Sequence, residues 1–148
     1  MKSNGLAWLG AAIALSAQVP AMAAEAPDSA DLREIDALTE PFIKGLTGGD
    51  AKGAIATLFS HSAIMQSKTA DISFLGAQAE AAIGAYGPIR ACILNETKNS
   101  SRWSLTRLYI CQHDKFLTRW LITMFKAPGG WQAATIRFDD KFGDAIGE

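Results

Sequence analysis

The side chains best suited to acid–base chemistry near neutral pH are histidines, and this 148-residue chain has two, His61 and His113. A histidine ring exchanges protons near neutral pH and is the commonest general base in enzymes. His61 lies between Ser60 and Ser62, directly after an apolar segment of helical spacing, and is the candidate catalytic residue. A second interpretation stays open, in which His61 is a polar residue at a helix end that is solvated or caps the backbone.

The second histidine and the cysteines do not build a recognisable centre. His113 precedes the turn-prone pair Asp114-Lys115, so we expect its ring to be exposed beside a hairpin turn. Two distant histidines and two cysteines lack the spacing of zinc ligands, and the serines lack the G-x-S-x-G pattern of an activated nucleophile. We therefore predict no metal site and no cofactor.

Charged residues near the C-terminal end offer a second set of candidates. Asp139 and Asp140 are adjacent, so in a strand they point to opposite faces and cannot share a proton. Arg137 falls beside Trp120 in the strand register proposed below, on the face assigned to the interior. A buried arginine needs a partner, so Arg137 and Trp120 are the candidate ligand-binding residues, with an anion as ligand. A structural ion pair or a one-residue register error are the alternatives for Arg137.

The first 23 residues have the three parts of a secretory signal peptide. Lys2 supplies a positive start, residues 6–15 are mostly apolar, and Pro20 precedes the small-residue pattern Ala21-Met22-Ala23. The apolar run is too short to span a membrane. We predict cleavage after residue 23 or one residue later, a location in the periplasm or outside the cell, and no membrane span in the mature chain. A formal net charge of −1 gives no indication of nucleic-acid binding.

The remaining residues, 24–148, are the usual size of one domain. Apolar periodicity and cap residues predict helices over residues 29–46, 51–59 and 75–86, and Pro41 should kink or restart the first. Beyond Pro88, β-branched and aromatic residues alternate with turn signals. They predict four strands over residues 89–97, 103–112, 117–126 and 131–138. The sequence therefore predicts an α+β domain, with three N-terminal helices packed on a curved antiparallel sheet of about four strands.

A strand register can be proposed from the turns. Pairing Lys126 with Trp131, and His113 with Leu117, sorts the side chains into two faces. One face carries Leu108, Ile110, Trp120, Ile122 and Met124. The other carries Leu94, Tyr109, Leu121, Phe125, Ile136 and Phe138, with Arg107 and Arg119 among them. Helices can cover only one face, so we predict a homodimer through the other.

Cys92 and Cys111 can be placed directly opposite each other in an antiparallel hairpin. The same register sets Ile93 opposite Ile110, Leu94 opposite Tyr109 and Glu96 opposite Arg107, which are all favourable cross-strand pairs. An oxidising compartment permits a disulfide between the two cysteines. Two buried free thiols acting as small apolar residues are the alternative, and both readings stay open.

Several short motifs of the sequence belong together as a set. They are Ala85-Tyr86-Gly87-Pro88-Ile89, the run from Arg119 to Pro128, Gly130-Trp131 and Phe138-Asp139-Asp140. They resemble motifs of the nuclear transport factor two-like (cystatin-like, SnoaL-like) superfamily of small exported bacterial proteins. The Gly49-Asp50 junction is similar to its helix junction, and Phe125 and Ala133 depart from its usual residues. The resemblance implies a cone of three helices against a curved sheet, often dimeric, with a pocket inside the cone.

The superfamily contains enzymes as well as members without a known reaction, and its catalytic residues cannot be matched here. Since fold alone does not transfer chemistry, we expect a binding domain with a cone-shaped pocket for a small apolar or amphipathic molecule, or for a protein. The first alternative is a small isomerase, dehydratase or hydrolase that uses His61 or another pocket acid or base. The second is a structural, dimeric accessory protein.

Overall fold

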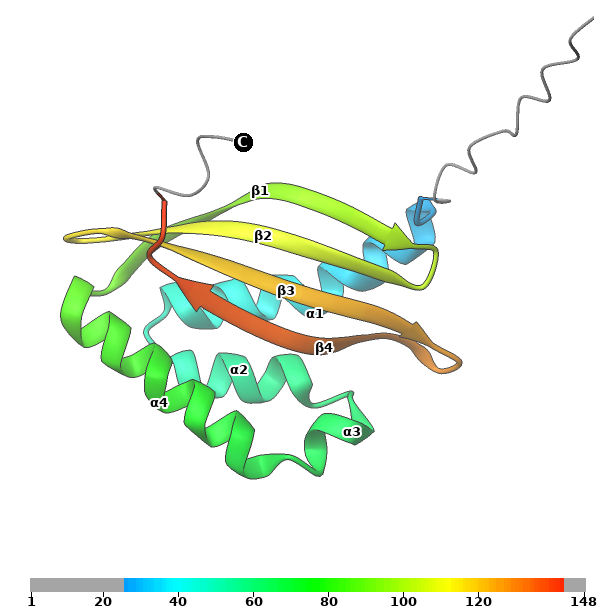
Figure 1. Ribbon diagram of the computed structural model, residues 1–148, viewed down its shortest axis with the longest axis horizontal. Coiled ribbons are helices and arrows are strands. Elements are labelled where there is room, and N and C mark those ends of the chain that lie inside the picture. The colour runs from blue at the N-terminus through cyan, green and yellow to red at the C-terminus, as the bar shows by residue number, and fades with distance from the viewer. Residues whose placement is uncertain (1–25, 143–148) are drawn as a thin grey trace, which may run out of the picture.

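The computed structural model describes residues 26–142 of the chain (Figure 1). The predicted signal peptide, residues 1–23, lies outside the described residues, so its cleavage stays a prediction. None of the helices within residues 26–142 is both long and apolar enough to cross a membrane.

Four helices precede the sheet within residues 26–142, and the first two begin at cap residues of the sequence. They are α1 (Ser29–Thr47), α2 (Ala51–Phe59), the short α3 (Ala63–Gln66) and α4 (Thr69–Tyr86). The Asp28 carboxylate accepts the first free backbone N–H groups of α1, and Asp50 does the same for α2. Pro41 does not divide α1, which continues through it as one helix, so the predicted restart is wrong and the predicted kink stays a prediction. α4 begins six residues earlier than the sequence pattern indicated.

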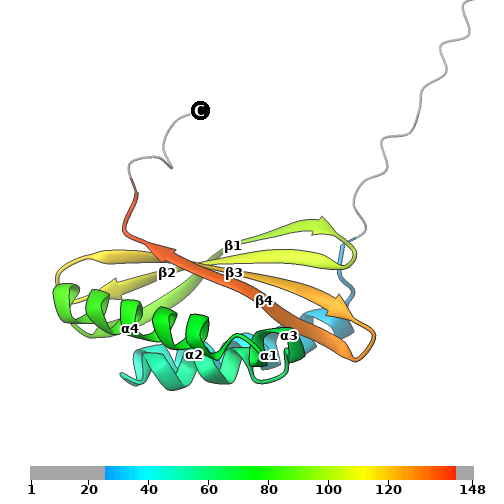
Figure 2. The same ribbon diagram turned by 60° about the horizontal axis from the view of Figure 1, so that its bottom comes forward.

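The second half of the chain is one open antiparallel sheet with strand order β1-β2-β3-β4. Its strands are β1 (Ile89–Ser101), β2 (Ser104–His113), β3 (Leu117–Ala127) and β4 (Gly130–Asp139). All helices lie on one side of this sheet, as Figure 2 shows. The predicted α+β class, with N-terminal helices and four antiparallel strands, is therefore confirmed. The cone shape stays a prediction.

The predicted register is wrong by one residue between β2 and β3. The backbone N–H of His113 donates to the carbonyl of Phe116 at 2.8 Å, so the hairpin turns over Asp114-Lys115 alone. Two-residue turns are the commonest hairpin connection because their twist matches that of the strands. Leu108 consequently pairs with Leu121, and Tyr109 pairs with Trp120.

A bulge changes the register between β3 and β4. Lys126 pairs with Trp131 as predicted, but Ala134 is an extra residue that has no partner on β3. Beyond this bulge Ile136 pairs with Ile122, and Arg137 pairs with Leu121. Arg137 is therefore exposed on the uncovered face, and its predicted interior position beside Trp120 is wrong.

The inner face of the sheet packs on the helices and forms the core. Trp120 is at its centre, with its ring stacked on Phe138 at 4.4 Å and meeting Phe42 edge-on at 5.8 Å. The largest fully buried apolar side chains are Trp120, Phe42, Phe59, Ile35, Leu46, Ile55, Leu58, Leu105, Ile122 and Met124. Tyr109 is also buried on this face, and not on the outer face as predicted, because a one-residue shift exchanges the two faces of a strand.

Arg107 is a buried cation within this core, and its predicted place on the outer face is likewise wrong. Its guanidinium contacts the Asp36 carboxylate at 2.7 Å and donates to the Thr39 hydroxyl at 2.9 Å, both on α1. Only 6% of the arginine side chain is exposed. A buried charge is tolerated when it is paired, so these contacts join α1 to β2 at a defined position.

We expect Asp36→Ala to lower the free energy of unfolding by roughly 2 kcal/mol, because it leaves the buried guanidinium without its counter-ion. Urea denaturation measures this change. Glu40→Ala, which removes an exposed carboxylate from the same helix, is the matched control and should change stability by less than about 0.5 kcal/mol. Equal losses in the two variants would show that the contact with Arg107 contributes nothing specific.

Candidate functional site

The sheet face opposite the helices, which we call the outer face, is covered by no helix of the described chain (Figure 2). One cross-strand row runs across all its strands. The paired residues are Glu96 on β1, Leu108 on β2, Leu121 on β3 and Arg137 on β4. The two leucines are partly buried and the two charged residues are exposed. We call these four residues the central row.

Apolar side chains lie on both sides of the central row, and the Thr106–Thr123 pair separates the row from Phe125. Ile93 is 63% exposed and Leu117 is 40% exposed, while Ile110 and Phe125 are partly buried. A hollow of about 300 Å³ lies over the middle of this surface and includes the whole central row in its lining. Scattered exposed apolar residues are ordinary, but a contiguous patch marks an interaction surface.

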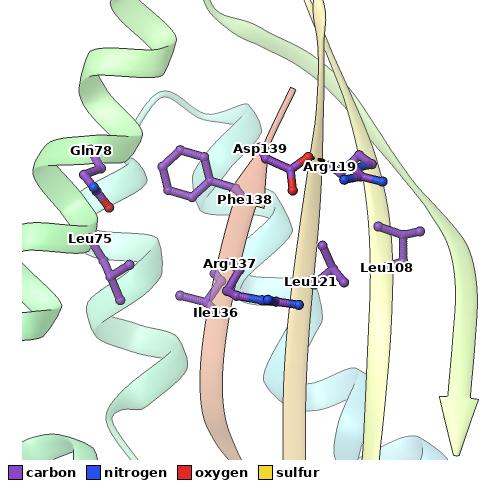
Figure 3. Close-up of a pocket in the computed structure, with 9 residues that line it drawn as sticks. All are labelled: Leu75, Gln78, Leu108, Arg119, Leu121, Ile136, Arg137, Phe138 and Asp139. Carbon is purple, nitrogen blue, oxygen red and sulfur yellow. Dashed lines mark hydrogen bonds and ion pairs between the residues drawn. The ribbon is translucent and has the colours of Figure 1, made fainter. Parts of the chain in front are cut away.

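A second hollow, of about 460 Å³, extends from α4 across the free edge of β4 onto the outer face, where Leu108, Leu121 and Arg137 of the central row also line it. Figure 3 shows Leu75 and Gln78 on α4 facing Ile136 and Phe138 on β4. A smaller hollow of about 180 Å³, lined by Ala82 and Tyr86 among others, shares Phe138 with it. The α4 residues are spaced by three and four positions, so they lie on one side of the helix. We call the two hollows together the α4–β4 groove.

The ionisable groups at the end of this groove already have partners. Arg119 donates to the Asp139 carboxylate at 2.8 Å, and this hydrogen bond holds the pKa of Asp139 below its usual 3.8. The Tyr86 hydroxyl donates to Asp140, whose carboxylate raises the pKa of the phenol above its usual 10.0. Asp139 therefore stays ionised and Tyr86 stays protonated near neutral pH. Neither is set to exchange a proton with a ligand.

His113 is buried, with 4% of its surface exposed, so its predicted exposure beside the turn is wrong. Its Nδ1 lies 2.7 Å from the Gly87 carbonyl oxygen, which can only accept, so Nδ1 carries a proton and donates. Its Nε2 lies 2.9 Å from the Thr118 hydroxyl. The same hydroxyl accepts a hydrogen bond from the Trp120 indole N–H. Both ring nitrogens are thus used to connect the end of α4 to β3. The short two-residue turn brings His113 inward, and the sequence pattern did not reveal this.

The structure does not bring the predicted site residues together. His61 is exposed after α2, where its Nδ1 lies 3.0 Å from the Ser60 hydroxyl, and it lines none of the hollows described above. Trp120 is 0% exposed and belongs to the core. Arg137 is on the outer face, where it makes no hydrogen bond or ion pair with any residue of the described range 26–142. Within that range no cluster of three or more histidine, cysteine or acidic side chains could hold a metal ion.

Cys92 and Cys111 are joined by a disulfide between β1 and β2. Ile93 faces Ile110 and Leu94 faces Tyr109, as the hairpin register predicted. The predicted pair of Glu96 with Arg107 is wrong, because a bulge at Asn95 places Glu96 opposite Leu108. This bulge moves Glu96 to the outer face, where it becomes one end of the central row.

No protein-family model, no curated protein and no solved structure matches this chain. The resemblance to the nuclear transport factor two-like superfamily therefore stays a prediction, which rests on the short motifs alone. The functional argument depends on the geometry of the outer face and of the α4–β4 groove.

We expect the disulfide to be formed in protein directed to the periplasm. Thiol labelling of that protein after denaturation without reductant should detect no reactive thiol. Replacing both cysteines with alanine should lower the free energy of unfolding by about 3 kcal/mol, because the cross-link restricts the unfolded chain. Two labelled thiols per chain would instead support the reading of two buried free cysteines.

Proposed function

We propose that this chain is a non-catalytic binding domain, acting in the periplasm or outside the cell, whose main binding surface is the outer face of the sheet. The partner at this surface is a second copy of the chain. The observation that carries the proposal is the leucine pair of the central row with Ile93 and Ile110 beside it, on a sheet face that no helix of the described residues covers. Homodimers commonly bury such patches, and the interface is then the same on both copies.

Binding is favoured over catalysis by the state of the ionisable groups. The two carboxylates and the tyrosine at the end of the groove are paired with each other or with Arg119, and both nitrogens of His113 are bonded to the protein. His61 lies away from the described hollows. A general acid or base has to reach the reacting group of a substrate, and no such residue borders the α4–β4 groove without a partner of its own.

The homodimer is tested by Leu121→Asp, which introduces a charge at the centre of the patch. Sedimentation velocity should show a dimer for the wild type at micromolar concentration and a monomer for the variant, because an unpaired carboxylate is costly to bury. Leu32→Asp is the matched control, since Leu32 is a partly exposed leucine on α1, away from the outer face, and it should leave the dimer intact. A monomeric wild type would contradict the proposal.

The α4–β4 groove supports a second candidate function, the binding of a small amphipathic molecule. Leu75, Ile136 and Phe138 supply apolar contacts, and Gln78 supplies a hydrogen-bonding amide beside them. A volume of about 460 Å³ is within the range of small-molecule sites, which combine apolar walls with a few polar groups. The filled core between the helices and the sheet makes this groove a better candidate than the predicted pocket inside the cone.

Native mass spectrometry of protein purified gently from periplasm tests this second candidate. We expect extra bound mass on the wild type and none on Gln78→Trp, whose indole would fill the groove. Ser73→Trp lies on the opposite side of α4 and is the control that should retain the ligand. A wild type without bound mass would remove the small-molecule function and leave the homodimer as the proposal.

A further inference from the structure

The central row carries opposite charges at its two ends. From β1 to β4 its residues are an acid, two leucines and a base, namely Glu96, Leu108, Leu121 and Arg137. Glu96 and Arg137 are both exposed, and neither makes an ion pair or a side-chain hydrogen bond within the described part of the chain. They cannot pair with each other, because three strand spacings of about 4.8 Å separate them by roughly 14 Å.

A second copy can form an ion pair with both charges at once in one particular orientation. Rotation by half a turn about an axis parallel to the strands, passing between Leu108 and Leu121, places β1 of one copy over β4 of the other. Glu96 then faces the partner's Arg137, and Leu108 faces the partner's Leu121. Because the contact is repeated by symmetry, two ion pairs flank a centre of four leucines.

The other two-fold arrangement of the same faces is disfavoured by charge. An axis along the central row itself would place Glu96 against the partner's Glu96 and Arg137 against the partner's Arg137. Like charges brought together in an interface reduce its stability, and this repulsion selects between orientations that bury the same apolar residues.

The dimensions of packed sheets allow the contact. Face-to-face sheets lie about 10 Å apart, a gap that opposed side chains fill from both sides. Their strands cross at about 30°. The ends of the row lie roughly 7 Å from the axis, so this crossing displaces Glu96 from the partner's Arg137 by roughly 4 Å along the strands. The long, flexible side chains of glutamate and arginine span such an offset.

We infer that two copies pack outer face to outer face about a two-fold axis parallel to the strands, with Glu96 of each copy ion-paired to Arg137 of the other. This inference rests on the proposed homodimer and adds its orientation. The leucines supply the buried area, and the charges decide which of the possible orientations forms.

Charge reversal tests the orientation. We expect Glu96→Arg and Arg137→Glu each to raise the dimer Kd at least tenfold, because each change places like charges at both ends of the row. The double variant should dimerise nearly as well as the wild type, since the charges are exchanged and the pairs are restored. An equimolar mixture of the two single variants should form a heterodimer for the same reason.

Two further charge reversals serve as controls, because they change net charge without touching the outer face. Glu40→Arg and Lys44→Glu both change exposed residues of α1, on the other side of the sheet. Both should leave the Kd within about threefold of the wild-type value. Circular dichroism melting curves establish that each variant is folded.

The possible outcomes distinguish an error in the proposed orientation from an error in the proposed homodimer. A wild type that dimerises while both single variants keep its Kd would overturn the orientation and leave the homodimer standing. Weakened single variants that neither the double variant nor the mixture rescues would also overturn it. A monomeric wild type would contradict the proposed function, and the orientation with it.

Discussion

Alternation of side chains along β2 and β3 determines almost everything else in this protein. Successive residues of a strand point to opposite faces, so the register of this central pair decides which residues enter the core. Tyr109 pairs with Trp120 on the face toward the helices, and Leu108 pairs with Leu121 on the other. The Asp114-Lys115 turn sets that register through the bond from His113 to Phe116. A shift of β3 by one residue relative to β2 would break the leucine pair, bury Leu121 and expose Trp120.

Two bulges then shape the outer face. Without the extra residue at Asn95, Glu96 would point toward the helices, and without Ala134, Arg137 would also point inward. Each bulge reverses the alternation of an edge strand relative to its neighbour, while the central strands continue undisturbed. Both exposed charges of the central row are thus products of local irregularities. Bulges of this kind direct particular side chains outward where a regular strand would bury them.

The sequence predicts the elements of this fold well and their fine alignment less well. Cap residues such as Asp28 and Asp50, and the turn around Pro128, mark ends that depend on nearby residues only. The Cys92–Cys111 register was accessible because the neighbouring apolar pairs agree with it. The bulges leave no comparable local signal, since an extra residue in an edge strand costs little and is decided by packing across the sheet. The bulge on β4 is the reason that the predicted position of Arg137 is wrong, and the shorter turn is the reason for Arg107 and His113. The predicted ligand site at Arg137 and Trp120 is wrong as a consequence.

The position of the disulfide has a consequence for how the molecule opens. It closes the β1–β2 hairpin only, across a sequence separation of 19 residues. In β1 just one residue, Ile89, is buried, so the strand adds little to the core that holds the helices and the other strands. In a chain with the disulfide reduced, the partial unfolding that releases β1 would therefore require little free energy. Amide hydrogen exchange along β1 should therefore be faster when the disulfide is reduced, while exchange in the core of β3 should not change. An edge strand held by a covalent bond more than by burial is well suited to an oxidising compartment.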